Sequence, residues 1–139
     1  MKYKGLSVAK KPMLFQRGSY GFDGIIHINN HLDNTQLPTT LEHEYQHHIF
    51  YQKHKWIKNL FHIQTPSLVI GILLYHLSKN PLFLALVLPF IVAELHEIDC
   101  FLKTKDYLYG TLRTIFHFAV AYLLFASIDL TFLMLENYY

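Results

Sequence analysis

Two histidines and a glutamate occur close together in the segment His43-Glu44-Tyr45-Gln46-His47. Residues four apart on an α-helix project from the same face, so a helix here would bring both imidazoles to one point. Neutral imidazole is a good Zn²⁺ ligand, and two of them leave positions for a third ligand and a water molecule. In an H-E-x-x-H segment the glutamate, here Glu44, acts as general base on the zinc-bound water. The segment therefore predicts a zinc site that activates water.

A third ligand has to come from elsewhere in the chain. His54 lies on the same helical face as His47 but about 10 Å further along a continuous helix, too far to share the metal. A group of acids occurs instead at the end of an apolar stretch, in Ala93-Glu94-Leu95-His96-Glu97-Ile98-Asp99-Cys100-Phe101. Carboxylates in an apolar setting are costly unless they are paired or bound to a metal. This segment therefore offers the third ligand.

The two segments together resemble the Glu-zincin metallopeptidases, over residues 24–103. In those families H-E-x-x-H is paired with a downstream helix bearing E-x-x-x-D, whose Glu is the third zinc ligand and whose Asp orients a ligand histidine. Several are embedded in membranes, including the CAAX prenyl-protease type and the antibiotic-sensor type. The resemblance implies His43 and His47 as zinc ligands, Glu44 as the catalytic base and Asp99 as the residue that orients a ligand.

The downstream segment departs from the family pattern in its register. Leu95, which is not an acid, stands four residues before Asp99, while Glu94 stands five before it and Glu97 two before it. A local bulge in the helix would bring Glu94 into the expected position. We therefore expect Glu94 to be the third ligand and keep Glu97 as its alternate.

A second resemblance suggests another acidic residue as the third ligand. The run Thr104-Lys105-Asp106-Tyr107-Leu108-Tyr109-Gly110 resembles the T-x-D-x-x-Y-G run of the Asp-zincins, in which the Asp is the third ligand. The glycine that usually precedes this run is Lys103 here. Asp106 therefore stays open as a competitor for the third position.

The elements that position these residues fall in two contrasting halves of a single domain, residues 1–139. Residues 1–62 are polar and rich in glycine, and Gly24–Asn29 is β-branched and bounded by turn formers, which predicts a short strand. Thr39-Thr40-Leu41-Glu42 fits a capping box, so we expect a helix to start near Thr40 and to run to about Asn59 or further. That helix would carry the H-E-x-x-H segment.

Residues 63–139 contain three apolar stretches, at 67–77, 82–93 and 114–135. A membrane span needs roughly 20 mostly apolar residues. The third stretch is long enough, and the first two reach that length as 56–78 and 81–102, joined by a tight turn at 77–81. The fold class expected is mainly α: a helical membrane protein with a small N-terminal β element, a zincin-like helix and about three apolar helices. A soluble helical core is the alternative.

The distribution of Lys and Arg indicates an orientation. Most lie in residues 1–60 and in 103–113, which we take as a loop, and none follows Arg113. By the positive-inside rule these regions face the cytoplasm, so we expect an integral membrane protein with its active site towards the cytoplasmic side. The net charge of +2 gives no reason to expect nucleic acid as a partner. The expected partners are membrane lipid and a peptide or protein substrate. Because the polar part of the chain is small, we also expect self-association or a partner protein to complete the site.

These observations predict a zinc-dependent metalloendopeptidase, a hydrolase with one Zn²⁺ per chain that cleaves peptide bonds. Two alternatives stay open. His43, His47 and His48 partly fit the histidine box of membrane iron oxygenases, although no second H-x-x-H-H box is present. A small non-enzymatic membrane protein with an incidental motif is the other. Metal analysis separates the three: one zinc, two irons, or none.

Overall fold

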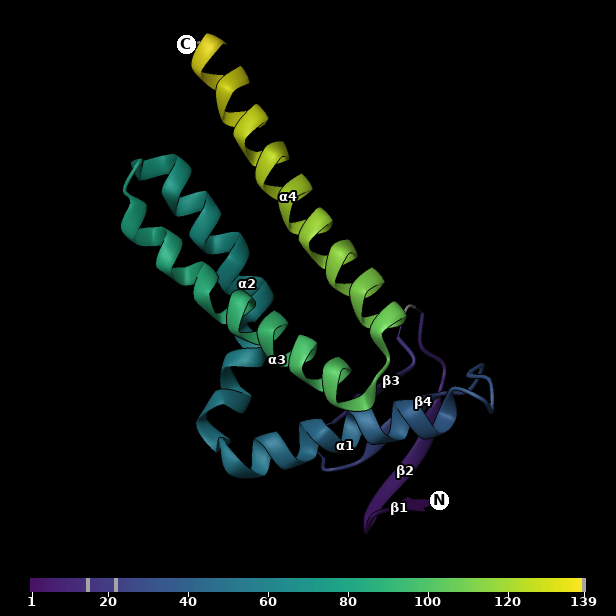
Figure 1. The fold of residues 1–139 in the computed structure, drawn as a ribbon. Coiled ribbons are helices and arrows are strands. Elements are labelled where there is room, and N and C mark those ends of the chain that lie inside the picture. The colour runs from purple at the N-terminus through teal and green to yellow at the C-terminus, as the bar shows by residue number, and fades with distance from the viewer. Residues whose placement is uncertain (15, 22, 139) are drawn as a thin grey trace. The chain divides into compact units, whose positions relative to one another are not determined.

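The structure is a computed structural model that describes residues 1–14, 16–21 and 23–138, and within these ranges all side chains except those of residues 56, 58, 60–62, 136 and 138. The fold is mainly helical with a small N-terminal β-sheet, as the sequence predicted (Figure 1). The chain divides into two compact units. One comprises Met1–Lys55 together with Cys100–Asp106, and the other comprises Trp56–Asp99 together with Tyr107–Tyr139.

The first unit contains a four-stranded sheet. Its strands, in spatial order, are β1 (Lys2–Tyr3), β2 (Leu6–Lys11), β4 (Ile26–Asn29) and β3 (Gly18–Tyr20). Strands β1 and β2 are antiparallel, β2 and β4 are parallel, and β3 and β4 are antiparallel. The strand predicted within residues 24–29 is confirmed as β4, whereas the other three strands were not predicted. Strand β3 forms one edge of the sheet, next to β4.

The hairpin between β1 and β2 turns at Lys4 and Gly5, which have φ angles of 46° and 87°. A two-residue hairpin turn of type I′ needs positive φ at both central residues. Glycine meets this need without steric cost, because it has no Cβ. The hairpin lies in a lysine-rich segment whose alternating pattern is weak, which is why its strands were not predicted.

Helix α1 (Leu37–Lys53) packs against β3 and β4. The sheet presents Ile26 and Ile28 to a small core, where they are 0% and 1% exposed, together with Val8 and Leu41. These two isoleucines alternate along β4, so one face of the strand is apolar, as expected for a sheet covered by a helix on one side. This core fixes α1 on the sheet.

Both predicted ends of α1 were wrong. The helix begins at Leu37 and not near Thr40, and its N-cap Gln36 forms no side-chain cap hydrogen bond. Pro38 occupies the first turn, where its missing N–H is not needed, and this replaces the predicted capping box. At the other end the helix stops at Lys53, because His54 has the non-helical angles φ −128° and ψ 62°. No glycine or proline marks that stop in the sequence.

The second unit consists of helical segments. These are α2 (Lys55–Ser78), the 3₁₀ helix η1 (Pro81–Val87), α3 (Leu88–Thr104) and α4 (Tyr107–Tyr138) (Figure 1). The first residue of α2 and the last residues of α3 belong to the first unit. The predicted turn between the first two apolar stretches is confirmed: Asn80 Oδ1 accepts a hydrogen bond from the Leu82 N–H at 3.0 Å. The predicted loop at 103–113 was wrong, since α4 already begins at Tyr107.

Within the described residues, two helical segments are long and apolar enough to cross a membrane: Pro81–Thr104, which joins η1 to α3, and Tyr107–Leu135 of α4. A shorter apolar helical segment, Ile63–Ser78, belongs to α2. In the window that qualifies α4 as a span, no residue is buried inside the structure. A long helix with so much uncovered apolar surface points to association with a membrane.

Candidate metal centre

Helix α1 brings the two histidines of the H-E-x-x-H segment together. His43, Glu44 and His47 are all buried, at 8%, 5% and 6% exposed. The Nε2 atoms of His43 and His47 lie 3.2 Å apart. Two nitrogens bound to one tetrahedral zinc at 2.0–2.1 Å are about 3.3 Å apart. The two imidazoles are therefore already spaced as a pair of ligands to one ion.

Aromatic side chains hold these two rings in place. The His43 ring stacks on Phe101 of α3, with centroids 4.3 Å apart and an interplanar angle of 27°. The His47 ring stacks on Tyr51, one turn further along α1, with centroids 6.0 Å apart. A ligand ring that is held by stacking loses little freedom when it binds, so this packing favours a fixed ligand geometry.

Glu44 lies where α1 approaches the edge strand β3. A methyl group added at Gly18 of β3 would come within 2.9 Å of Thr40 Cγ2 and 3.1 Å of Glu44 Oε1. Only glycine therefore allows the strand to come so close to the helix. The close approach places the Glu44 carboxylate beside the edge of the sheet.

Tyr20, at the end of β3, contacts side chains of α1. Its hydroxyl and His48 Nδ1 form a hydrogen bond of 2.8 Å, and its ring stacks on Tyr51 with centroids 6.1 Å apart. Burial, and to a smaller extent the charge of Asp23, raise the pKa of Tyr20. The phenol therefore keeps its proton at pH 7 and can form the hydrogen bond with His48. This contact fixes the edge strand against α1.

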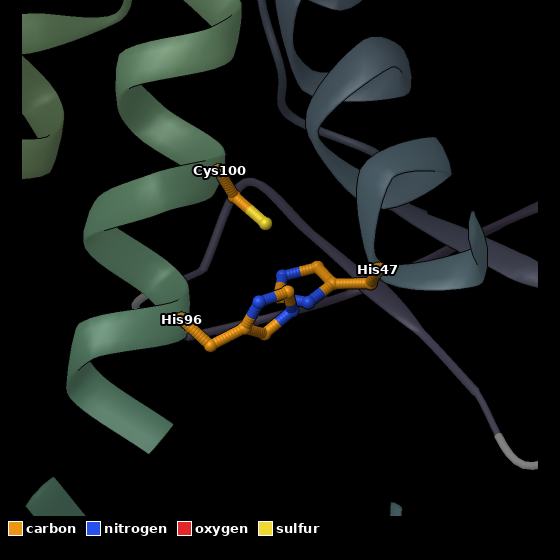
Figure 2. A group of neighbouring side chains, drawn as sticks. All are labelled: His47, His96 and Cys100. Carbon is orange, nitrogen blue, oxygen red and sulfur yellow. The ribbon is translucent and has the colours of Figure 1, made fainter. Parts of the chain in front are cut away.

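The last turns of α3 supply further donor atoms. One ligand atom each from His43, His47 and Glu97 lie within 4.8 Å of one another. The same holds for a second group, His47, His96 and Cys100, whose side chains point towards one another in Figure 2. His96, Glu97 and Cys100 follow each other within about one turn of the continuous helix α3. These buried or partly buried groups could hold a metal ion.

The donor set can be compared with the ligands that different metal ions prefer. It combines imidazole nitrogens, one carboxylate and one thiol. Mg²⁺ and Ca²⁺ prefer sites made of oxygen atoms, whereas imidazole and thiolate suit zinc and other transition metals. The residues present therefore fit the kind of metal that the H-E-x-x-H segment implies.

The predicted third ligand, Glu94, has other partners in the structure. Its carboxylate Oε1 lies 2.7 Å from His117 Nδ1, and its Oε2 lies 3.9 Å from Arg113 Nη1. Among the residues that the structure describes, neither metal-capable group includes Glu94. Its alternate Glu97 belongs to the group with His43 and His47. The choice between the two acids stays a prediction, and the geometry favours Glu97.

The other two predicted acids can also be placed. Asp106 Oδ2 accepts a hydrogen bond of 2.7 Å from Arg17 Nη1 in an ion pair that joins the loop before β3 to the turn after α3. Within the described part of the chain, Asp106 is in neither metal-capable group. Asp99 is partly buried on α3, and its role in orienting a ligand stays a prediction.

Sequence reasoning did not identify His96 and Cys100 as ligands. A signal for them was available, because they are four residues apart on one helix, the same spacing as His43 and His47. His96 and Cys100 are 7% and 1% exposed. Two helices therefore each carry a pair of ligand-type side chains on one face.

Compared with known protein families, with curated proteins and with solved structures, the chain matches none. Any function therefore has to be inferred from the residues of the candidate metal centre.

Proposed function

We propose that this chain is a zinc-dependent metallopeptidase that acts at a membrane. The observation that carries the proposal is the 3.2 Å separation of His43 Nε2 and His47 Nε2 on a buried face of α1, with a Glu97 carboxylate oxygen in the same group. Two histidines and one carboxylate are a ligand set that leaves a position open for water, as in catalytic zinc sites. Zinc bound there would lower the pKa of a water molecule towards 7 and polarise a peptide carbonyl.

The protein's own contribution to the reaction is the transfer of one proton by Glu44. Glu44 directly follows the ligand His43, and its carboxylate can accept a proton from the attacking water. The same carboxyl group can then donate that proton to the leaving nitrogen of the cleaved peptide bond. Because Glu44 is only 5% exposed, bulk water competes little for this proton.

Strand β3 offers a way to hold the substrate. It pairs with β4 on one side and lies at the edge of the sheet in the order β1-β2-β4-β3. An extended peptide can add to such an edge through main-chain hydrogen bonds. Since Gly18 of β3 lies against Glu44, a peptide added there would pass close to the candidate catalytic base. We propose an extended peptide segment as the substrate class.

The apolar helices support action at a membrane. Pro81–Thr104 and Tyr107–Leu135 are long and apolar enough to span one, and we propose that they do. Lys and Arg are concentrated before Asn59 and around the turn between α3 and α4. By the positive-inside rule, we propose that α1 and the last turn of α3 face the cytoplasm.

The proposal is tested on the full chain purified in detergent without chelator. We expect one zinc per chain by mass spectrometry of metals, and cleavage of a quenched fluorescent peptide library. Glu44→Gln should retain the zinc and lower the cleavage rate by about 10²–10⁴-fold, the usual contribution of general acid–base catalysis.

Glu42→Gln is the matched control, because it makes the same chemical change on the same helix outside the candidate centre. It should cleave as the unaltered chain does under conditions where both are folded. Unchanged cleavage by Glu44→Gln would show that the proposed role is wrong, and two irons per chain would favour the oxygenase alternative.

A further inference from the structure

Cys100 is the only cysteine of the chain and lies in the most buried part of α3, where it is 1% exposed. Its neighbour Phe101 stacks on the His43 ring of α1 with centroids 4.3 Å apart. Both Cys100 and Phe101 belong to the same compact unit as α1. The thiol is therefore held beside the H-E-x-x-H helix by contacts within one unit.

Two buried histidines accompany this thiol. A ligand atom of His96, one turn before Cys100 on α3, and one of His47 lie within 4.8 Å of the sulfur and of each other (Figure 2). His47 also belongs to the group with His43 and Glu97. The two groups therefore share His47, and a single ion can be bound by the ligands of either group.

The number of protein ligands decides what a zinc site can do. Zinc with three protein ligands keeps a position for water and can be catalytic, whereas zinc with four is closed and structural. His43, His47 and Glu97 supply three ligands. The group of His47, His96 and Cys100 also supplies three, and His43, whose Nε2 lies 3.2 Å from that of His47, would be a fourth, giving three nitrogens and one sulfur.

We propose that Cys100 and His96 form a closing ligand pair that shuts the metal centre by replacing water and Glu97. This proposal rests on the metal centre of the proposed function and adds its regulation. In the exchange, His96 takes the position of Glu97, Cys100 takes the position of water, and the thiol proton passes to solvent. No oxidation state changes. The chain would therefore hold its metal in a latent form that becomes active when Cys100 withdraws.

The experiment loads the full chain in detergent with Co²⁺ in place of zinc and records its absorption. A bond between cobalt and a thiolate gives a charge-transfer band in the near ultraviolet. Because the chain has one cysteine, such a band can come only from Cys100. We expect the band in the unaltered protein, and we expect Cys100→Ala to lack it while still binding one cobalt per chain through the other ligand set.

Two results would overturn the inference. A cobalt-loaded unaltered chain without the band would show that Cys100 is not a ligand. Loss of cobalt from Cys100→Ala would show that the thiol is an obligatory ligand and that no second set exists. If Cys100→Ala does not fold, as judged by circular dichroism, His96→Gln is used instead. It should weaken the band several-fold with one cobalt retained, and an unchanged band would equally overturn the inference.

Peptide cleavage gives a separate readout. Cys100→Ala should raise kcat several-fold with KM unchanged, because more of the protein is in the open state, and an unchanged kcat would contradict a closing role. If no variant cleaves any peptide, the proposed function fails. The cobalt band still decides whether Cys100 binds the metal, so the two failures can be told apart.

Discussion

His117 Nδ1 of α4 lies 2.7 Å from Glu94 Oε1 of α3, inside the apolar helical unit. Arg113, one turn earlier on α4, lies 3.9 Å from the other oxygen of Glu94 and 3.4 Å from Glu97 Oε2. The Glu94 side chain is only 4% exposed. Charges in such an apolar setting are tolerated when they are paired, and α4 supplies the partners. The pairing with His117 accounts for Oε1 of Glu94, whereas the buried Oε2 forms no hydrogen bond within the described part of the chain.

The first prediction concerns which acid binds the metal. In a Cys100→Ala background, where the closing ligand set is absent, Glu97→Gln should weaken zinc binding by more than about 100-fold, because it removes a ligand, while residues that only support ligands contribute about 10–100-fold. Glu94→Gln should stay within that smaller range. Competition with a chromophoric chelator measures both affinities. A larger loss in Glu94→Gln than in Glu97→Gln would restore Glu94 as the ligand and reverse the interpretation of the α3–α4 contacts.

The second prediction concerns the stability of the helical unit. Glu94→Gln removes the carboxylate that His117 and Arg113 share, but Arg113 keeps Glu97 Oε2 at 3.4 Å, so the expected cost is that of a buried polar group left without its partner, about 1–3 kcal/mol. We expect the free energy of unfolding in detergent to fall by this order. The double variant Glu94→Gln with His117→Asn should recover part of the loss, because two neutral groups can form a hydrogen bond. A stable Glu94→Gln protein that binds no metal would contradict this account.

The sequence was sufficient where the deciding forces are local. The pairing of His43 with His47 follows from helical spacing alone, and the strand within Gly24–Asn29 from its β-branched pattern and flanking turn residues. The apolar helices followed from composition. These features depend on neighbours within a few residues, which a single sequence displays.

The sequence was insufficient where a feature depends on contacts between residues that are distant in the chain. Glu94 and Glu97 share a helical face, and the structure distinguishes them because His117 of α4 contacts Glu94, whereas Glu97 belongs to the group with His43 and His47. Cys100 stands four residues after His96 in the sequence, but only the His43–Phe101 contact shows that it lies beside α1. The strands of residues 1–20 are short and polar, and their pairing with β4 supplies what their own sequences lack.

The third prediction concerns the approach of β3 to α1. Gly18→Ala would place a methyl group 2.9 Å from Thr40 Cγ2 and 3.1 Å from Glu44 Oε1, closer than side chains pack. The strand or the carboxylate must move, so we expect a stability loss of about 1–3 kcal/mol and a reduced cleavage rate. Ser19→Ala on the same strand is the control and should change neither the stability nor the cleavage rate. Normal cleavage and stability in Gly18→Ala would show that the approach is not constrained.

The fourth prediction concerns acid stability. Burial by itself raises the pKa of Glu42, but hydrogen bonds from Lys4, Tyr3 and Gln46 outweigh it, and the pKa lies below its ordinary value. A carboxyl whose pKa is lowered by folding stabilises the fold fully above its unfolded pKa of about 4.3 and loses that contribution as pH falls through the folded pKa.

Glu42→Gln should therefore be less stable than the unaltered chain at pH 7, and the difference should shrink below about pH 4. Thermal unfolding measured across pH checks this. Tyr3→Phe removes one hydrogen bond and keeps the charge, so it should lower stability by about 1 kcal/mol while retaining most of the pH dependence. A constant difference between Glu42→Gln and the unaltered chain at every pH would contradict the assignment.

The last prediction concerns metal and stability. Because His43 and His47 are buried with their Nε2 atoms 3.2 Å apart, zinc should bind the folded chain far better than the unfolded chain. Zinc at 1,000 times its dissociation constant then adds about 4 kcal/mol to the free energy of unfolding, and a chelator removes it. Mg²⁺ at the same concentration should have no effect, because it prefers oxygen ligands. His47→Asn should abolish the zinc effect, since His47 is common to both ligand groups. Persistence of the effect in His47→Asn would place the zinc elsewhere in the chain.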